Sequence, residues 1–188
     1  IAYQRKVFEI GSLAETTHTV RIEWTGRKNP ASTGTAVGLD AIQISGALVQ
    51  ADPAEVITSY EQTDRHMVYE GTWSTSNNTL MSGGSYKFTN TTSSTVTIAF
   101  TGKRFEWYTA KNNNFGEALV SVDGGQPALV DLYAPSIQYK QRVWSSGDLT
   151  DGRHTVTITC AGTKNAASSG TYIGVDRIDM VGTINPVR

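Results

Sequence analysis

The sequence predicts an all-β protein, an antiparallel two-sheet β-sandwich or jelly roll. The 188 residues are rich in Gly, Ser, Thr and Asn, and threonine and valine alternate through most apolar stretches. Such alternation is typical of strands with one face in a core and one face in water. Turn signals such as Asn77-Asn78, Gly83-Gly84 and Asp151-Gly152 separate these stretches. No stretch predicts an amphipathic helix of three turns.

The expected strands fill the second part of the chain. Val96, Ile98 and Phe100 share one face of a clear example. Short alternating segments joined by tight turns favour a sandwich or jelly roll. The strands are expected at residues 56–60, 67–73, 85–89, 95–101, 104–109, 118–122, 128–133, 139–145, 154–160 and 172–181.

Two parts of the chain repeat one another without a gap. Residues 3–46 align with residues 139–182 at a constant offset of 136, and 19 of the 44 aligned pairs are identical. The stretch "GRKNPASTGTAVGLD" in the first copy becomes "GTKNAASSGTYIGVD" in the second. A period of this length suits a whole domain rather than a solenoid repeat. We therefore expect residues 58–184 to form a complete module, residues 51–57 to be a linker, and residues 1–50 to be the C-terminal half of a preceding module.

The incomplete copy would leave an apolar face and open sheet edges in water. We expect residues 1–50 not to fold alone. A complementary chain fragment or a neighbouring subunit would complete them, by strand swapping or β-addition.

Composition excludes several classes of function. The formal net charge of −1 gives no electrostatic reason to bind nucleic acid or an anionic membrane. No apolar run approaches the length of a membrane helix, and the first ten residues lack the pattern of a signal peptide. The single cysteine, Cys160, excludes an internal disulfide and is expected to be a buried core thiol. Nucleophile-elbow, zinc-protease and phosphate-loop motifs are absent, so we expect no enzyme activity.

Predicted loops instead combine aromatic rings with amides and cations. Sugar rings stack on Trp or Tyr, and their hydroxyls hydrogen-bond to amides and charged groups. The alternative for Trp107 is a core position, and for the asparagines a turn role. For Lys164 and Asn165 the alternative is capping of the loop and packing of the lysine stem. The candidate ligand-binding residues are Trp107, Tyr108, Lys111, Asn113, Asn114, Tyr133, Lys164 and Asn165.

Asp176 and its counterpart Asp40 each interrupt an otherwise apolar strand. A carboxylate in such a place must be paired, hydrogen-bonded or bound to a metal. Glu61 and Asp64 are expected neighbours because first and last strands often lie side by side, and three carboxylates would suit a structural Ca²⁺. The alternative is that Asp176 bonds to backbone amides or to Arg65.

Three stretches carry a resemblance to a known superfamily: "YEQTDRHMVYEGTWS", "SVDGGQPALVDLYAPSIQYKQRVWSSGDLTDGRHTVTI" and "GTYIGVDRIDMVG". They resemble the galactose-binding-like jelly-roll superfamily, which includes carbohydrate-binding modules of secreted bacterial polysaccharide-degrading enzymes. The resemblance implies a non-catalytic, extracellular module that holds an enzyme near a polysaccharide. It also implies a structural calcium at Glu61 and Asp176, with Asp64 as a further ligand.

Two other functions remain open from the sequence. Tandem sandwiches also serve as structural spacers or adhesion modules of surface or phage-tail proteins. The chain could also be an accessory fragment of a nicked glycoside hydrolase or polysaccharide lyase.

Overall fold

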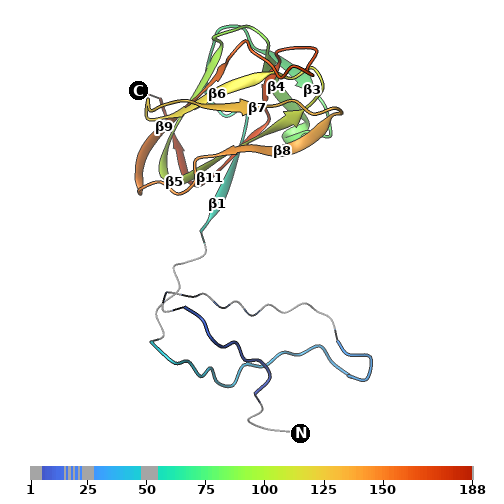
Figure 1. Ribbon diagram of the computed structural model, residues 1–188, viewed down its shortest axis with the longest axis vertical. Coiled ribbons are helices and arrows are strands. Elements are labelled where there is room, and N and C mark those ends of the chain that lie inside the picture. Colours follow the sequence, from blue (N-terminus) through green and yellow to red (C-terminus); the bar gives the residue numbers. More distant parts are fainter. Residues whose placement is uncertain are drawn as a thin grey trace. The chain divides into compact units, whose positions relative to one another are not determined.

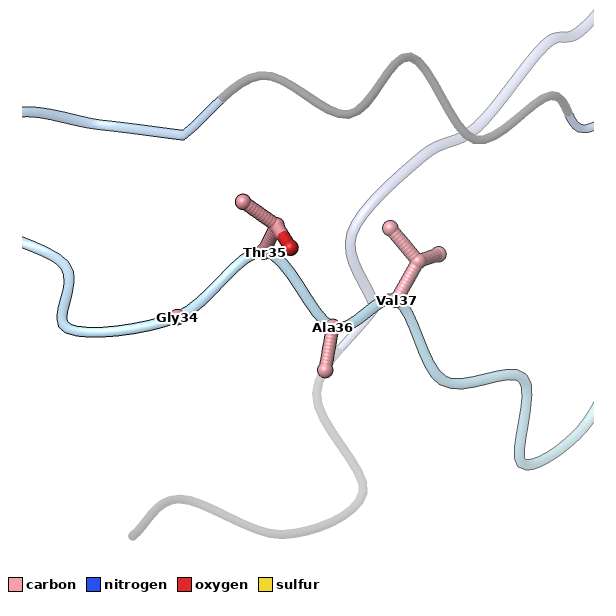
Figure 2. A pocket seen from close by; sticks show the side chains of 4 residues that line it. All are labelled: Gly34, Thr35, Ala36 and Val37. Atoms are coloured by element: carbon pink, nitrogen blue, oxygen red, sulfur yellow. The ribbon is translucent and has the colours of Figure 1, made fainter.

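The structure, a computed structural model, divides the chain into two compact units, residues 1–54 and 55–188 (Figure 1). The described residues of the first unit form no helix or strand, and all are exposed. Figure 2 shows residues 34–37 of this unit, where Thr35 and Val37 point to one side and Ala36 to the other, as in an extended chain. The described residues are 6–14, 16, 18, 20, 22, 28–47 and 55–187.

Eleven β-strands lie in the described part of the second unit, together with one short 3₁₀ turn, η1, at Ser82–Gly84. The strands are β1 (Ile57–Glu61), β2 (Val68–Glu70), β3 (Ser74–Asn77), β4 (Ser85–Thr89), β5 (Thr95–Lys111), β6 (Glu117–Val122), β7 (Ala128–Asp131), β8 (Gln138–Ser145), β9 (Gly152–Cys160), β10 (Ile173–Val175) and β11 (Arg177–Asn185).

The strands form two antiparallel sheets, which confirms the predicted all-β sandwich. The larger sheet has the order β1-β11-β5-β9-β6-β7, and β2 and β8 also pair with β5. The smaller sheet has the order β10-β4-β3. Figure 1 shows β11 beside β5, the longest strand, with β1 next to β11. No helix in the described ranges is long and apolar enough to span a bilayer.

Three strand predictions differ from the structure. The strands expected at 95–101 and 104–109 are one continuous strand, β5, because Gly102 lies opposite Gly182 of β11 and a side chain at either would meet the facing backbone. The strand expected at 172–181 is divided at Asp176 into β10 and β11, which belong to different sheets. Strand β3 was missed because its sequence, STSN, has no apolar alternation.

The core contains the inward-facing residues of both sheets. Cys160 is buried there, as the sequence predicts, and burial raises the pKa of its thiol. Trp107 is also fully buried in this core. The largest fully buried apolar side chains are Trp107, Phe100, Phe105, Met81, Ile98, Leu132, Ile158, Ile173, Ile178, Met180 and Val96.

Candidate functional site

Three loops of the sandwich are joined by backbone hydrogen bonds, and we call them the loop cluster. They are residues 112–116 between β5 and β6, residues 132–137 between β7 and β8, and residues 161–172 between β9 and β10. The joining bonds run from Asn112 N to Leu132 O (3.2 Å), from Ser169 N to Asn113 O (2.9 Å) and from Gly116 N to Tyr172 O (2.8 Å).

Side chains fix the longest of these loops from inside. The buried Ser168 hydroxyl lies 2.6 Å from the Phe115 carbonyl oxygen and donates to it. Asn165 donates from Nδ2 to Asp131 Oδ2 at 2.7 Å and accepts the Ala167 amide at its Oδ1. The structure thus gives Asn165 the capping role that the sequence left open.

The remaining loop candidates offer polar groups at the surface. Asn113 is exposed, and among the described residues its carboxamide has no protein partner. The side chains of Lys111 and Tyr133 are half-buried, so part of each faces solvent. Asn114 has a buried Oδ1 without a partner in the described part of the chain. Lys164 is exposed, and its ammonium donates to Ser168 O at 2.7 Å.

Trp107 does not belong to this surface. It is fully buried, and its Nε1 donates to the Gly174 carbonyl oxygen at 3.1 Å, so its faces pack in the core and cannot stack on a sugar. The core alternative for this residue is therefore the one the structure supports. Strand alternation in β5 explains it, because Trp107 has the same parity as the buried Phe105.

Tyr108 is on the outward side of β5, and its ring is already covered. The Arg177 guanidinium lies 4.3 Å from the ring centroid, and the hydroxyl donates to Glu106 Oε2 at 3.0 Å. Burial, and then the hydrogen bond to Glu106, raise the pKa of the Tyr108 phenol. Tyr108 lies within β5 rather than in the loop cluster, and Lys111 is the last residue of the same strand.

The structure adds an aromatic group that sequence reasoning did not select. Tyr172, in the loop cluster, has its ring centroid 5.9 Å from that of Phe88, which in turn is 5.6 Å from that of Tyr86. Burial, followed by the charges of Tyr139 and Tyr172, raises the pKa of Tyr86, so its hydroxyl stays protonated at neutral pH. We call Tyr86, Tyr139 and Tyr172 the tyrosine cluster. They are half-buried and combine apolar ring faces with hydroxyl donors.

Asp176 lies in a second polar site, where β1, η1 and β11 meet. It is completely buried, and Ser82 N donates to its Oδ1 and Oδ2 at 2.9 and 3.2 Å. This confirms the backbone-amide alternative. Burial is the main cause that raises the pKa of Asp176 to about 6, and the nearby Glu61 contributes in the same direction.

The predicted calcium ligands are only partly brought together. Asp64 accepts the His66 amide at 2.8 Å and lies 2.9 Å from the His66 ring, so its carboxylate is engaged elsewhere. Within the described ranges, no group of three or more His, Cys, Asp or Glu could hold a metal ion. Glu61 Oε2 and Gln62 Oε1 are buried oxygens without a partner in the same part of the chain. These orphaned oxygens and Asp176 are of the type that Ca²⁺ prefers.

Comparison with known proteins found no matching family model. Two curated relatives come from Flavonifractor plautii. An A type blood alpha-D-galactosamine galactosaminidase is 33% identical over 109 residues, which is 58% of this chain and 10% of that protein. An A type blood N-acetyl-alpha-D-galactosamine deacetylase is 31% identical over 109 residues, 58% of this chain and 14% of that protein. The matched part is therefore a small fraction of either relative.

Comparison with solved structures identifies the fold of this chain. A CBM35 carbohydrate-binding module from Cellvibrio japonicus has a TM-score of 0.50 at 18% identity, covering 71% of this chain and 99% of that chain. The second unit has the fold of a carbohydrate-binding module. A Paenibacillus xanthan lyase also matches, with a TM-score of 0.53 at 18% identity over 71% of this chain and 14% of that enzyme. The predicted resemblance is thereby confirmed at the level of fold, and the loop cluster and tyrosine cluster are surfaces of this module.

Proposed function

We propose that the module, residues 58–184, binds glycans without catalysing their conversion, as part of a larger extracellular enzyme. The observation that carries this proposal is the convergence of the loop cluster with the tyrosine cluster through Tyr172. Backbone hydrogen bonds join the loops that carry Asn113, Tyr133 and Tyr172, and the Tyr172 ring centroid lies 5.9 Å from that of Phe88. Preorganised polar groups around an aromatic surface bind sugars at low entropic cost.

The relatives support a binding role over a catalytic one. A galactosaminidase and a deacetylase carry out different reactions, yet both share the same 109-residue length of match with this chain. A match of this length in two proteins that carry out different reactions is better explained by a glycan ligand than by either chemistry. The named substrates make glycans ending in α-linked galactosamine or N-acetylgalactosamine the first ligands to test.

The binding test uses the full chain on a glycan array that includes A-type, H-type and polysaccharide ligands, followed by titration calorimetry on the best ligand. Tyr133→Ala and Asn113→Ala should each weaken binding about tenfold, since a stacked ring or a well-placed hydrogen bond contributes about 1–2 kcal/mol. Lys103→Ala is the control and should leave binding unchanged, because Lys103 is exposed and lies outside both clusters.

Absence of binding across the panel, with the sandwich folded, would overturn the glycan proposal and favour a spacer or adhesion role. Release of reducing sugar or acetate by the chain alone would overturn its non-catalytic part. Binding that every loop variant retains would place the ligand on another surface.

The second polar site is proposed to hold a structural Ca²⁺. Glu61, Gln62 and Asp176 would supply oxygen ligands, and the ion would neutralise two carboxylates that otherwise repel each other. Asp64 is left out of this set because it is bonded to His66.

A further inference from the structure

The first unit repeats local hydrogen bonds of the module at the same offset of 136 residues. In both copies an asparagine accepts the amide two residues on, and a serine bonds to the glycine two residues on. In both copies, too, a histidine Nε2 lies 2.8 Å from the carbonyl oxygen four residues earlier. The paired bonds are Ala31 N to Asn29 Oδ1 (2.9 Å) with Ala167 N to Asn165 Oδ1 (3.0 Å), Ser32 Oγ to Gly34 O (2.8 Å) with Ser168 Oγ to Gly170 O (3.0 Å), and His18 Nε2 to Ala14 O with His154 Nε2 to Thr150 O.

Several apolar side chains in the described part of the first unit are exposed, although their counterparts in the module form the core. Val37, Leu39 and Ile42 are 61–66% exposed, as are Val20 and Ile22 at 60–65%. The matching positions of the module are all 0% exposed: Ile173, Val175, Ile178, Val156 and Ile158. The same side chains that fill one sandwich therefore lie uncovered in the other copy.

Two glycines indicate which part of the module has no counterpart against the first unit. A side chain at Gly170 would lie 2.6 Å from the Asn114 carbonyl oxygen, and one at Gly174 would lie 2.8 Å from Thr109 Oγ1. Their counterparts Gly34 and Gly38 have nothing within 4 Å of the same position. Glycine is thus required at these sites only when the β5 region and the loop after it pack against them.

The polar side chains of the repeated segment are matched to acids in the first half of the module. In the complete copy, Asn165 Nδ2 donates to Asp131 and His154 Nδ1 lies 2.7 Å from Asp123. Asn29 and His18 keep the donor groups that such acids would receive.

From this match we infer that His18, Val20, Ile22 and residues 28–46 are a docking surface for a polypeptide segment patterned like residues 57–138. The segment would supply the counterparts of β1 to β7, cover the exposed apolar side chains, and present one carboxylate to Asn29 and one to His18. Docking would complete a second sandwich, and this inference is independent of whether the module binds glycans. Burial of five aliphatic side chains gives the driving force, and the two carboxylates fix the register.

The test joins a second copy of residues 57–138 ahead of Tyr3 of the full chain, so that the junction reproduces the spacing of the module. Hydrogen–deuterium exchange is then followed over residues 28–46. In the original chain these amides should exchange within seconds. In the extended chain they should slow at least 100-fold, since amides of a closed sandwich exchange only through opening.

Matched variants separate docking from unrelated effects. Gly34→Ala, or Leu39→Asp with Ile42→Asp, should abolish the protection in the extended chain and leave residues 57–185 unchanged. Pro30→Ala should keep it, because the module itself has alanine at the matching Ala166. Lack of protection in the extended chain would overturn the inference. Protection that the original chain acquires by dimerising as its concentration rises would also overturn it, in favour of a second copy as the occupant.

Discussion

The ring of His154 is held between the carboxylate of Asp123 and a backbone carbonyl. His154 Nδ1 lies 2.7 Å from Asp123 Oδ2, and His154 Nε2 lies 2.8 Å from Thr150 O. Because both nitrogens face acceptors, the doubly protonated ring is best satisfied. The hydrogen bond to Asp123, and then that to Thr150, raise the pKa of His154. Burial opposes ionisation of Asp123, but His154 and the Thr155 amide outweigh it and lower its pKa.

This pair predicts a pH-dependent contribution to stability. The His154 part is complete below the ordinary pKa of 6.5 and is lost as pH rises through the raised folded value. The Asp123 part is present above the ordinary pKa of 3.8 and is lost as pH falls through the lowered folded value. A double-mutant cycle of His154→Gln and Asp123→Asn, measured by urea unfolding, should give a coupling of about 1 kcal/mol at pH 5.5.

The same cycle at pH 9 is the control. The coupling should fall to a few tenths of a kcal/mol there, because the ring has lost its charge. A coupling that is equal at pH 5.5 and pH 9 would mean that the folded protein holds a neutral imidazole, contrary to the geometry.

The sequence contained enough to predict the fold but only part of the site. Alternation in stretches such as 95–100 and 154–160 fixes which side chains face the core, and that pattern depends on neighbours along the chain. The same rule would have placed Trp107 inside, since it shares the parity of Phe105. Its large aromatic ring beside a polar loop suggested a ligand instead. Asn113 and Tyr133 remain predicted ligand-binding residues, and their positions in loops follow from turns, which concentrate Asn, Pro and Gly.

Contacts between distant strands could not be predicted in the same way. Tyr86 and Tyr172 are 86 residues apart in the sequence, and they come near each other because β4 pairs with β10. The bond between His154 and Asp123 likewise joins a residue of β9 to one in the turn after β6. The sequence around His154 or Asp123 does not indicate which residue it bonds to, because strand register and sheet order are properties of the whole fold.

Trp107 and Tyr133 should respond to substitution in opposite ways. Trp107→Phe removes the hydrogen bond to the buried Gly174 carbonyl and shrinks a packed core, so it should lower the free energy of unfolding by about 2–3 kcal/mol. Glycan affinity below the melting temperature should stay within twofold of the original. Tyr133→Ala should do the reverse, with loss of affinity and a small change in stability. Calorimetry and thermal unfolding on both variants provide the comparison, and a ligand-binding loss confined to Trp107→Phe would contradict the assignment.

Gly116 should control the shape of the loop cluster. A side chain at this position would lie 2.6 Å from Thr171 Cα and 2.7 Å from the Thr163 carbonyl oxygen, both of which are backbone atoms. Gly116→Ala should therefore cost about 1–3 kcal/mol and weaken glycan binding by displacing the loop before β10. Gly125→Ala is the control, since its nearest contact is at 3.1 Å and it lies in the distant turn between β6 and β7. If Gly116→Ala and Gly125→Ala changed glycan affinity equally, the loop cluster would not be the glycan-binding surface.

Asp176 should make the calcium-free protein less stable at neutral pH than in mild acid. Its folded pKa of about 6 exceeds the ordinary value of 3.8, so the folded state holds the proton more tightly and stability falls as pH rises from about 4 to about 6. Asp176→Asn removes this ionisation while keeping an acceptor for Ser82 N. In chelator at pH 8 it should raise the free energy of unfolding by about 1–3 kcal/mol, and at pH 4 by almost nothing.

Added Ca²⁺ should make the original chain more stable than Asp176→Asn at pH 8. An ion bound only by the folded protein stabilises it by about 2.7 kcal/mol at a hundredfold excess over its dissociation constant. The melting temperature of the original chain should therefore rise with Ca²⁺, while those of Asp176→Asn and Glu61→Gln should not. Asp64→Asn should keep the response, because that carboxylate is bonded to His66. If Ca²⁺ leaves the melting temperature unchanged while the acid-range profile remains as predicted, the site holds no Ca²⁺ and Asp176 titrates without a metal ion.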